Sequence, residues 1–295
     1  PRMHVLVTGG TGFIGTRLCA ELAERGHDVT ALSRSPEGEV PDGVDTYVGD
    51  VTALDSIRGA FDGVDAVVNL VALSPLFKPS GGDERHLEVH YGGTQNVIEA
   101  AEEHDVDKLV QMSALGADPT GPTAYIRAKG LAEDAVHDSA LDYTIIRPSV
   151  VFGEGGEFVS FTKLLTTPYV TGLPGGGKTR FQPIWVDDLV PMLADALGDE
   201  HDGETYELGG PEQLTLADVT RLVYRADGKS TSVLPIPMAL AKIGLSVADV
   251  VPGAPMGSDQ YRSLRFDNTV SENDVGAFGV SEDDLRTFAD YLDVA

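Results

Sequence analysis

Short apolar runs and longer segments of helical periodicity alternate along the first 150 residues. The apolar runs, which predict buried strands, lie at residues 4–8, 28–32, 46–48, 65–72, 108–112 and 143–147. Segments with apolar residues at helical spacing lie between them, at 13–25, 53–60, 84–104 and 124–137. Strands that alternate with helices are typical of right-handed βαβ units on a parallel sheet. We therefore predict an α/β fold with a Rossmann-type doubly wound parallel sheet.

The alternation ends after Arg147 and Pro148, where Gly and Pro begin to cluster, at 153–156 and 172–177. We predict a nucleotide-binding core at residues 1–150, to which 181–212 return. Residues 151–180 and 213–295 then form a smaller C-terminal substrate lobe. The most apolar late segment, 233–256, is interrupted by prolines and charged residues, so we expect no membrane span there.

A glycine-rich turn, Thr8-Gly9-Gly10-Thr11-Gly12-Phe13-Ile14-Gly15, joins the first strand to the first helix. This is the context that a dinucleotide-binding loop requires. Gly9 allows the sharp turn, Gly12 lets the backbone approach a pyrophosphate, and Gly15 lets the helix pack on the sheet. The phosphates then face free N–H groups at the helix N-terminus. The predicted cofactor contacts here are Gly9, Thr11, Gly12, Phe13, Ile14 and Gly15.

The second strand is followed by Ser33 and Arg34, where a site for NAD usually has Asp or Glu to bind the ribose 2′-hydroxyl. Arg34 can instead pair with a 2′-phosphate and stack on adenine, the alternative being a solvated surface arginine. We therefore predict NADP(H) as the favoured cofactor and NAD(H) as the alternative. After the third strand, Asp50 and Val51 are expected to border the adenine. Asp50 either accepts a hydrogen bond from the adenine amino group or caps the next helix.

Tyr125 and Lys129 are four residues apart in a predicted helix, so they face the same side. Ser113 follows the strand at 108–112, and open α/β sheets bind ligands at the carboxyl ends of their strands. A Tyr hydroxyl can exchange a proton with a carbonyl, a nearby Lys favours the phenolate, and a Ser hydroxyl can hold the carbonyl oxygen. We predict that the three residues form an acid–base site. The alternative is an exposed helix face on which Lys129 pairs with Glu133.

Together these motifs resemble the short-chain dehydrogenase/reductase superfamily, in its extended or atypical branch. The glycine loop and the set Ser113, Tyr125 and Lys129 match that family's cofactor loop and catalytic residues. Further similar segments are Tyr91-Gly92-Gly93-Thr94-Gln95-Asn96 in the fourth helix and Arg147-Pro148-Ser149-Val150-Val151-Phe152-Gly153 after the sixth strand. The last segment, with Phe181-Gln182-Pro183-Ile184-Trp185-Val186-Asp187-Asp188, resembles the subgroup of the nucleotide-binding accessory subunit of respiratory complex I.

The resemblance implies cofactor contacts at Val71, Ala72, Tyr125, Lys129 and Pro148, and hydride transfer to or from a small carbonyl or hydroxyl substrate. It also implies two alternatives. One is a nucleotide-sugar epimerase or dehydratase, although 151–180 lacks an obvious basic cluster for a diphosphate. The other is a cofactor-binding structural or assembly protein that docks to a respiratory membrane complex. His90 stands where the family has an active-site Asn that shapes a proton relay to the Lys, which favours the structural alternative.

Two further patterns are rejected as sites. Residues 172–179 match the phosphate-binding pattern of ATPases, but the residues after Lys178 predict a strand where that pattern requires a helix. The seven His residues show no metal-ligand spacing, and His86 and His90 are the only i, i+4 pair. We therefore expect no metal site.

The chain has 47 acidic against 21 basic residues, a net charge of −26, and only seven of the basic residues are Lys. Dispersed acid with little Lys is typical of a halophilic surface, where salt screens the repulsion. The charge argues against nucleic acid and anionic membranes as partners. Cys19, the only cysteine, is expected in the core, and the absence of a disulfide and of a signal peptide predicts a cytoplasmic protein.

Overall fold

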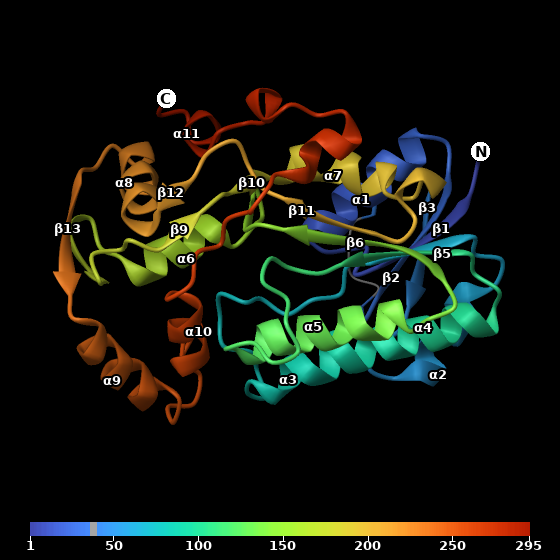
Figure 1. Ribbon diagram of the computed structural model, residues 1–295, viewed down its shortest axis with the longest axis horizontal. Helices are drawn as coiled ribbons and strands as arrows, with labels where there is room; N and C mark the ends of the chain where they lie inside the picture. The colour runs from blue at the N-terminus through green and yellow to red at the C-terminus, as the bar shows by residue number, and fades with distance from the viewer. Residues whose placement is uncertain (36–39) are drawn as a thin grey trace. The chain divides into compact units, whose positions relative to one another are not determined.

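The computed structural model of the chain describes residues 1–35 and 40–295, and its largest sheet has seven strands in the order β11-β6-β5-β4-β1-β2-β3 (Figure 1). From β3 to β6 all neighbouring strands pair in parallel. The predicted α/β fold with a parallel Rossmann-type sheet is confirmed. The strands of this sheet are β1 His4–Thr8, β2 Asp28–Ser33, β3 Val44–Val48, β4 Ala66–Asn69, β5 Lys108–Met112, β6 Asp142–Pro148 and β11 Glu204–Leu208.

Helices cover both faces of this sheet. In Figure 1, α1 and α7 lie on one face, and α2, α4 and α5 on the other. Two ion pairs, Arg17–Asp187 and Arg25–Asp195, join α1 and its C-cap residue Arg25 to α7. These elements are α1 Phe13–Glu24, α2 Leu54–Ile57, the 3₁₀ turn η1 Arg58–Phe61, α3 Glu84–His86, the π-helical turn η2 Leu87–Gly92, α4 Gly93–Glu103, α5 Ala124–His137, α7 Val186–Asp195 and the 3₁₀ turn η3 Asp199–His201.

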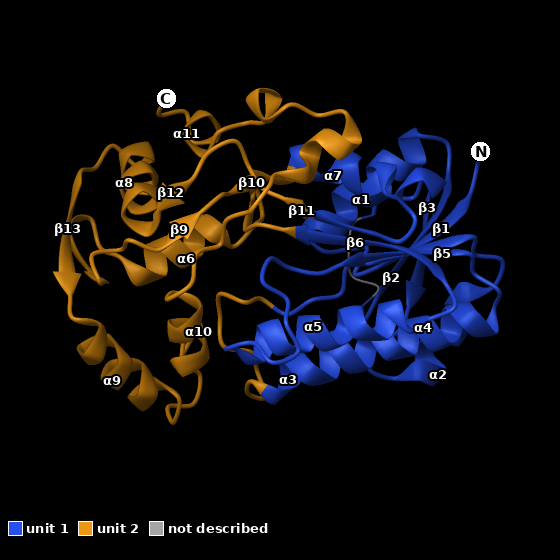
Figure 2. Cartoon of the chain, in the orientation of Figure 1, with its two compact units in different colours: residues 1–73, 84–147, 187–206 blue, residues 74–83, 148–186, 207–295 orange. Residues whose placement is uncertain are grey.

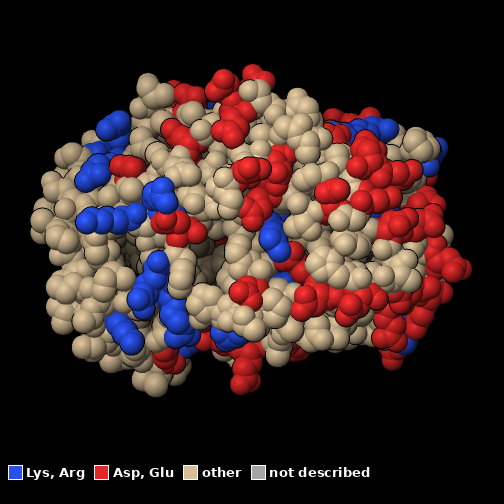
Figure 3. All heavy atoms as spheres, in the orientation of Figure 1, with Lys and Arg blue, Asp and Glu red and all other residues tan. Residues whose placement is uncertain are grey.

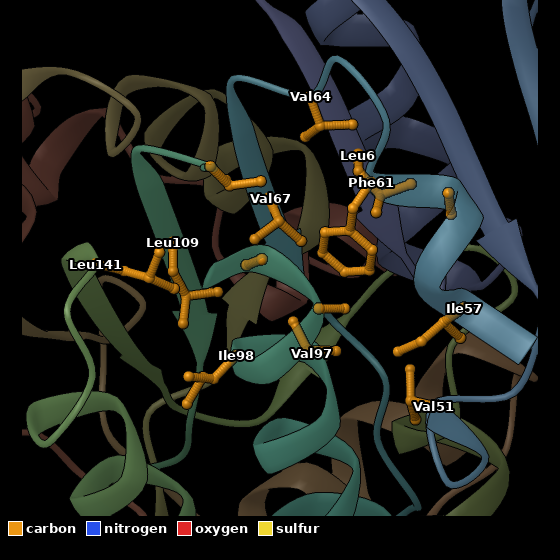
Figure 4. Close-up of a cluster of buried hydrophobic side chains, with 14 of the residues drawn as sticks. Leu6, Val51, Ile57, Phe61, Val64, Val67, Val97, Ile98, Leu109 and Leu141 are labelled. Carbon is orange, nitrogen blue, oxygen red and sulfur yellow. The ribbon is translucent and has the colours of Figure 1, made fainter. Parts of the chain in front are cut away.

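The hydrophobic core on the α4 side of the sheet explains why the apolar runs form strands there. Figure 4 shows Leu6, Val67 and Leu109 of three neighbouring strands facing Val97 and Ile98 of α4. Parallel strands that are covered on both faces consist almost wholly of apolar residues. Burial of a side chain of this size stabilises the fold by about 1.5–3 kcal/mol.

The chain divides into two compact units (Figure 2). Unit 1 comprises residues 1–73, 84–147 and 187–206, and unit 2 comprises 74–83, 148–186 and 207–295. We predicted that one part binds the nucleotide and the other the substrate, and this assignment of roles stays a prediction. The predicted nucleotide-binding core is 1–150 with 181–212, and the predicted substrate lobe is 151–180 with 213–295.

Unit 2 has its own aromatic core. The ring of Phe288 lies 5.1 Å from that of Phe152 and 5.4 Å from that of Phe158, between centroids. Its elements are β7 Val151–Phe152, α6 Phe158–Leu165, β8 Tyr169–Pro174, β9 Arg180–Phe181, β10 Ile184–Trp185, β12 Leu214–Thr215, α8 Leu216–Ala226, β13 Thr231–Ile236, α9 Met238–Ala248, α10 Ser258–Ser263, the 3₁₀ turns η4 Asp274–Phe278 and η5 Glu282–Asp284, and α11 Phe288–Tyr291. No helix begins at Lys178; the short strand β9 follows it, as the sequence predicts.

Two predicted elements differ in detail from the observed ones. The strand expected at 65–72 ends at Asn69, since the main chain leaves the sheet to pass the glycine turn. The helix expected at 84–104 is divided into α3, η2 and α4 by a π-helical turn, and a pattern based on 3.6 residues per turn does not predict such a turn.

Candidate functional site

The glycine turn after β1 has the geometry of a phosphate cradle. Gly9 has φ +68°, a left-handed conformation that L side chains rarely adopt. A Cβ on Gly15 would lie 2.1 Å from the carbonyl oxygen of Gly9, so only glycine fits there. Gly12 is the N-cap of α1 and brings no side chain to the helix end.

These residues fit a dinucleotide, because the first N–H groups of a helix have no intrahelical partners and attract anions. Gly12 is exposed, and Thr11, Phe13 and Ile14 are partly exposed, so the helix N-terminus faces solvent. The cation of Arg17 stacks on the Phe13 ring, 4.9 Å from its centroid. The helix N-terminus is therefore accessible where the sequence predicts a pyrophosphate.

The ends of β2 and β3 carry the residues expected at the adenosine. Ser33 ends β2 and donates to the carbonyl of Ser35, and Arg34 is exposed beside it. Burial acts to raise the pKa of Asp50, but hydrogen bonds from Thr52 and the charges of Arg34 and Arg85 outweigh it and lower that pKa. Asp50 does not cap α2, whose N-cap is Ala53, so that alternative was wrong. Val51 is buried and would contact a Cβ placed on Gly93.

The segment after β4 runs along the glycine turn. The amide nitrogen of Val71 lies 3.3 Å from the position of a Cβ on Gly9, and Ala72 is exposed. Leu73 donates its main-chain N–H to Nε2 of His90, at 3.2 Å. Val71 and Ala72 thus lie against the loop with which they are predicted to share the cofactor.

A buried polar network beneath this segment was not predicted. The Thr8 hydroxyl donates to the Asn69 amide oxygen at 2.6 Å, and the Asn69 amide donates to Gln111 at 3.0 Å and to Thr94 at 3.2 Å. The Thr94 hydroxyl donates in turn to the carbonyl of His90 at 2.6 Å. Three strand ends are thereby fixed to α4. The signal in the sequence was the presence of Asn and Gln inside otherwise apolar runs.

Lys129 lies between Tyr125 and the end of β5. Its Nζ donates to the main-chain oxygen of Met112, the residue before Ser113, at 3.1 Å, and lies 5.7 Å from the centroid of the Tyr125 ring. Burial lowers the pKa of Lys129 to about 8, and the charge of Glu133 opposes this shift. Burial also raises the pKa of Tyr125, whereas we expected Lys129 to lower it.

Glu133 pairs with Arg147, so the alternative of a Lys129–Glu133 salt bridge is not observed among the described residues. The Glu133 carboxylate lies 2.9 Å from an Arg147 guanidinium nitrogen. Burial raises the pKa of Glu133, and Arg147 together with the Ser113 hydroxyl lowers it. Ser113 is buried and lies beside this carboxylate in a geometry that falls short of a hydrogen bond.

Two buried histidines pack against Tyr125. The His86 and His90 rings stack with centroids 5.6 Å apart, and both contact the Tyr125 ring edge-to-face, at 5.5 and 5.3 Å. Burial and the charges of Lys129 and His86 hold the pKa of His90 well below its usual range. Nδ1 of His90 has no hydrogen-bond partner in the described part of the chain.

The structure therefore brings Tyr125 and Lys129 together, places Ser113 directly after the carbonyl that Lys129 binds, and puts the predicted loop residues at the same edge of the sheet. Pro148 ends β6, belongs to unit 2, and stays a prediction. An open hollow between α4 and α5, lined among others by Glu99, Glu102, Asp134 and Asp138, contains none of the predicted site residues.

Over residues 1–35 and 40–295, no group of three or more His, Cys, Asp or Glu side chains could hold a metal ion. Within the same residues no helix is both long and apolar enough to cross a membrane.

Comparisons with known proteins identify the family of the chain. A profile of the NAD(P)H-binding family matches residues 9–163. The chain is 28% identical over 288 residues to the mitochondrial NADH dehydrogenase [ubiquinone] 1 alpha subcomplex subunit 9 of Arabidopsis thaliana, covering 90% of this chain and 71% of that protein. It is 31% identical over 257 residues to 2-alkyl-3-oxoalkanoate reductase of Stenotrophomonas maltophilia, covering 77% of this chain and 76% of that protein.

Among solved structures, a nucleoside-diphosphate-sugar epimerase of Staphylococcus aureus is similar over 98% of this chain and 99% of its own, with a TM-score of 0.75. Its sequence identity is 18%, so this likeness shows the fold alone.

Proposed function

Since this chain belongs to the NAD(P)H-binding family, we propose that it is an NADP(H)-dependent oxidoreductase of the short-chain dehydrogenase/reductase type that reduces a carbonyl group of a small molecule. The observation that carries the proposal is the position of Lys129, which lies between the Tyr125 ring and the Met112 carbonyl next to Ser113. Bound NADPH supplies the hydride.

Tyr125 acts as the acid. Because burial raises its pKa, its hydroxyl is protonated at neutral pH. It can donate that proton to the carbonyl oxygen while the carbonyl carbon takes the hydride. A protonated tyrosine suits reduction of a carbonyl, which needs an acid. Oxidation of an alcohol, the reverse reaction, needs the phenolate as a base. Ser113 holds the same oxygen by a hydrogen bond, after its hydroxyl turns away from Glu133.

Lys129 has two roles in the proposal, to hold the nicotinamide ribose and to favour the phenolate that Tyr125 leaves behind. With a pKa of about 8 its ammonium is mostly charged at neutral pH, as both roles need. Arg34 binds the 2′-phosphate of the cofactor. Because positions 33 and 34 are Ser and Arg, no carboxylate stands there to repel that phosphate.

The test is a screen of small carbonyl compounds with NADPH, followed by a comparison of Tyr125→Phe with wild type. We expect Tyr125→Phe to abolish turnover while cofactor affinity, measured by fluorescence titration, stays within about twofold, because only the hydroxyl is lost. Lys129→Ala should weaken both turnover and cofactor binding.

Tyr143→Phe is the matched control, because Tyr143 lies in β6 against His137, outside the proposed site. It should turn over like wild type. Equal activity of Tyr125→Phe and Tyr143→Phe, in the presence of a substrate that wild type reduces, would refute the acid role of Tyr125.

A cofactor-binding structural protein is the second candidate. His90 in place of the family's Asn and Ser113 beside Glu133 favour it, and the relative in Arabidopsis is named as a subunit of NADH dehydrogenase. In this case no carbonyl compound is reduced and Tyr125→Phe is silent, while Gly12→Val, which blocks the helix N-terminus, still abolishes cofactor binding. The epimerase or dehydratase alternative gains nothing beyond a shared fold. Of the basic residues in 151–180, Lys163 and Arg180 are paired with Asp227 and Asp267, and the remaining one, Lys178, does not make a basic cluster.

A further inference from the structure

Helix α9 of unit 2 lies on the surface with an apolar side turned outward. None of its residues is buried, and Ala241, Leu245 and Ala248 on its inner side are only half-buried. Leu240, Ile243 and Val247 share the opposite side at i, i+3 and i+7 and are 61%, 63% and 59% exposed.

Exposed apolar side chains also lie in the strands that precede the helix and in the turn that follows it. Strands β8 and β13 pair over their full length, and Met238 at the start of α9 contacts the turn that follows β8. Of the twelve large hydrophobic side chains that are exposed among the described residues, eight belong to these three elements and the turn after α9. We call them the α9 surface: Tyr169, Val170, Leu234, Leu240, Ile243, Val247, Val250 and Val251.

The charge around the α9 surface is opposite to that of the chain. Unit 1 has 30 acidic against 10 basic residues, and unit 2 has 17 against 11. Within unit 2, residues 158–186 and 213–266 together have nine basic residues against four acidic ones, a local charge of +5. In Figure 3, Lys and Arg gather over unit 2, while Asp and Glu dominate over unit 1.

Several of these cations have no acidic partner. Each of the four acids is already engaged: Asp218 with Arg221, Asp227 with Lys163, Asp259 with Arg262, and Asp249 with the Ser258 hydroxyl. Of the nine basic residues in these two ranges, five form no ion pair with a described residue: Lys178, Arg225, Lys229, Lys242 and Arg265. Lys242 lies on α9 itself, and Lys229 precedes β13.

We propose that the α9 surface binds the surface of an anionic lipid bilayer. Leu240, Ile243 and Val247 enter the boundary between headgroups and acyl chains, as the apolar side of an interfacial helix does. Lys229 and Lys242 contact anionic headgroups. A chain of net charge −26 would be repelled by such a surface if its charge were evenly spread, but unit 1 contributes −20 of that charge and the α9 surface almost none.

A second copy of the chain fits this surface less well. In a two-fold symmetric dimer the same patch faces itself, so the interface would gather Lys229 and Lys242 of both copies with no acidic surface to neutralise them. An anionic lipid surface would instead attract these lysines.

The test is co-flotation of the purified chain with vesicles of phosphatidylcholine alone and of phosphatidylcholine mixed with phosphatidylglycerol, at the lowest KCl concentration at which the circular dichroism spectrum stays native. We expect the chain to float with the mixed vesicles and not with phosphatidylcholine alone. Val247→Glu should weaken this binding at least about tenfold, since it places a charge where the helix enters the boundary. Val48→Glu is the matched control, because Val48 of β3 is similarly exposed, at 52%, but lies in unit 1; it should float like wild type.

The double change Lys229→Glu and Lys242→Glu should also lower vesicle binding about tenfold or more, while Val247 is unchanged. No flotation of wild type with the mixed vesicles overturns the proposal. So does equal flotation of Val247→Glu and Val48→Glu. A concentration-dependent dimer in size-exclusion chromatography that Val247→Glu dissociates, without vesicle binding, assigns the surface to a second copy instead. Because none of these readouts uses activity or cofactor, their failure leaves the proposed reductase function untouched.

Discussion

The main-chain N–H of Leu73 donates to Nε2 of the buried His90 at 3.2 Å, and this contact fixes the state of the imidazole. A nitrogen that accepts a hydrogen bond carries no proton, so the neutral ring has its proton on Nδ1. Protonation would give Nε2 an N–H that faces the N–H of Leu73, so the hydrogen bond would be lost and the segment after β4 released. His90 therefore holds the loop beside the cofactor turn only while it is neutral.

Acid should destabilise the chain through His90. Its pKa is well below 6.5 in the folded state, so between that value and 6.5 the unfolded chain binds more protons and stability falls as pH falls. Below pH 6, the free energy of unfolding of wild type should fall more steeply with decreasing pH than that of His90→Asn. We expect the two slopes, measured by urea unfolding, to differ by roughly 1 kcal/mol per pH unit. His137→Asn, at an exposed position of α5, is the control and should leave the pH dependence unchanged. Parallel curves for wild type and His90→Asn would contradict the assignment.

Lys129→Met should make the folded chain more stable at pH 7 while abolishing turnover. The pKa of Lys129 falls from 10.5 to about 8 on folding, so the charged ammonium is unfavourable in the folded state below pH 8. The unfolded chain binds more protons between pH 8 and 10.5, and the stability of wild type rises with pH through that window. We expect Lys129→Met to gain about 2 kcal/mol at pH 7 in urea unfolding, and this gain should shrink toward pH 10. A gain that does not depend on pH would point to packing instead.

The sequence predicts the sheet, most element bounds and the cofactor turn, because these depend on local patterns. The apolar runs of buried strands and the glycines of a tight turn are visible within a few residues. What could not be predicted depends on contacts between distant residues. The pairing of Glu133 with Arg147, the histidines stacked beside Tyr125 and the network from Thr8 to Thr94 each join separate elements.

Gly15→Ala should damage both the fold and the cofactor site. Its methyl group would lie 2.1 Å from the Gly9 carbonyl oxygen, which is main chain and cannot turn away. We expect a loss of at least about 3 kcal/mol in chemical denaturation and no detectable NADPH binding. Gly276→Ala, where a Cβ meets nothing within 4 Å, should change stability by less than about 1 kcal/mol. Equal effects of the two changes would refute the steric argument.

Arg34→Ala should weaken NADPH binding by about 1.5–3 kcal/mol, a tenfold or larger increase in Kd, and leave NADH binding nearly unchanged. Arg34 forms no ion pair in the described part of the chain, so its guanidinium is available to a 2′-phosphate. Fluorescence titration with both cofactors measures the effect. Arg225→Ala, an exposed arginine of α8 in unit 2, is the control. Equal affinity of wild type for NADPH and NADH would remove the preference we propose.

Salt should stabilise the chain. Unit 1 carries most of the net charge of −26, and four carboxylates line the hollow between α4 and α5. At about 1 M salt the Debye length is about 3 Å, which screens this repulsion. We expect the thermal midpoint to rise by about 10 °C or more from 0.1 M to 2 M KCl. The pair Asp134→Asn and Asp138→Asn should lessen that rise, and a midpoint that is flat or falls with salt would exclude a halophilic surface.

The π-helical turn η2 determines the angular phase between His86 and α4. A π-turn holds one residue more than an α-turn, and each residue of an α-helix advances by about 100°. Deletion of a single residue from Leu87–Gly92 would therefore shorten the helix only slightly. It would, however, rotate the part of the helix before the deletion about the helix axis, relative to the part after it. If Thr94 and Val97 kept their places on the sheet, His86 would turn about 100° away from Tyr125. One inserted residue is enough to bring a second imidazole to the tyrosine, so chain length in this short segment can alter the surroundings of Tyr125 without any substitution in α5.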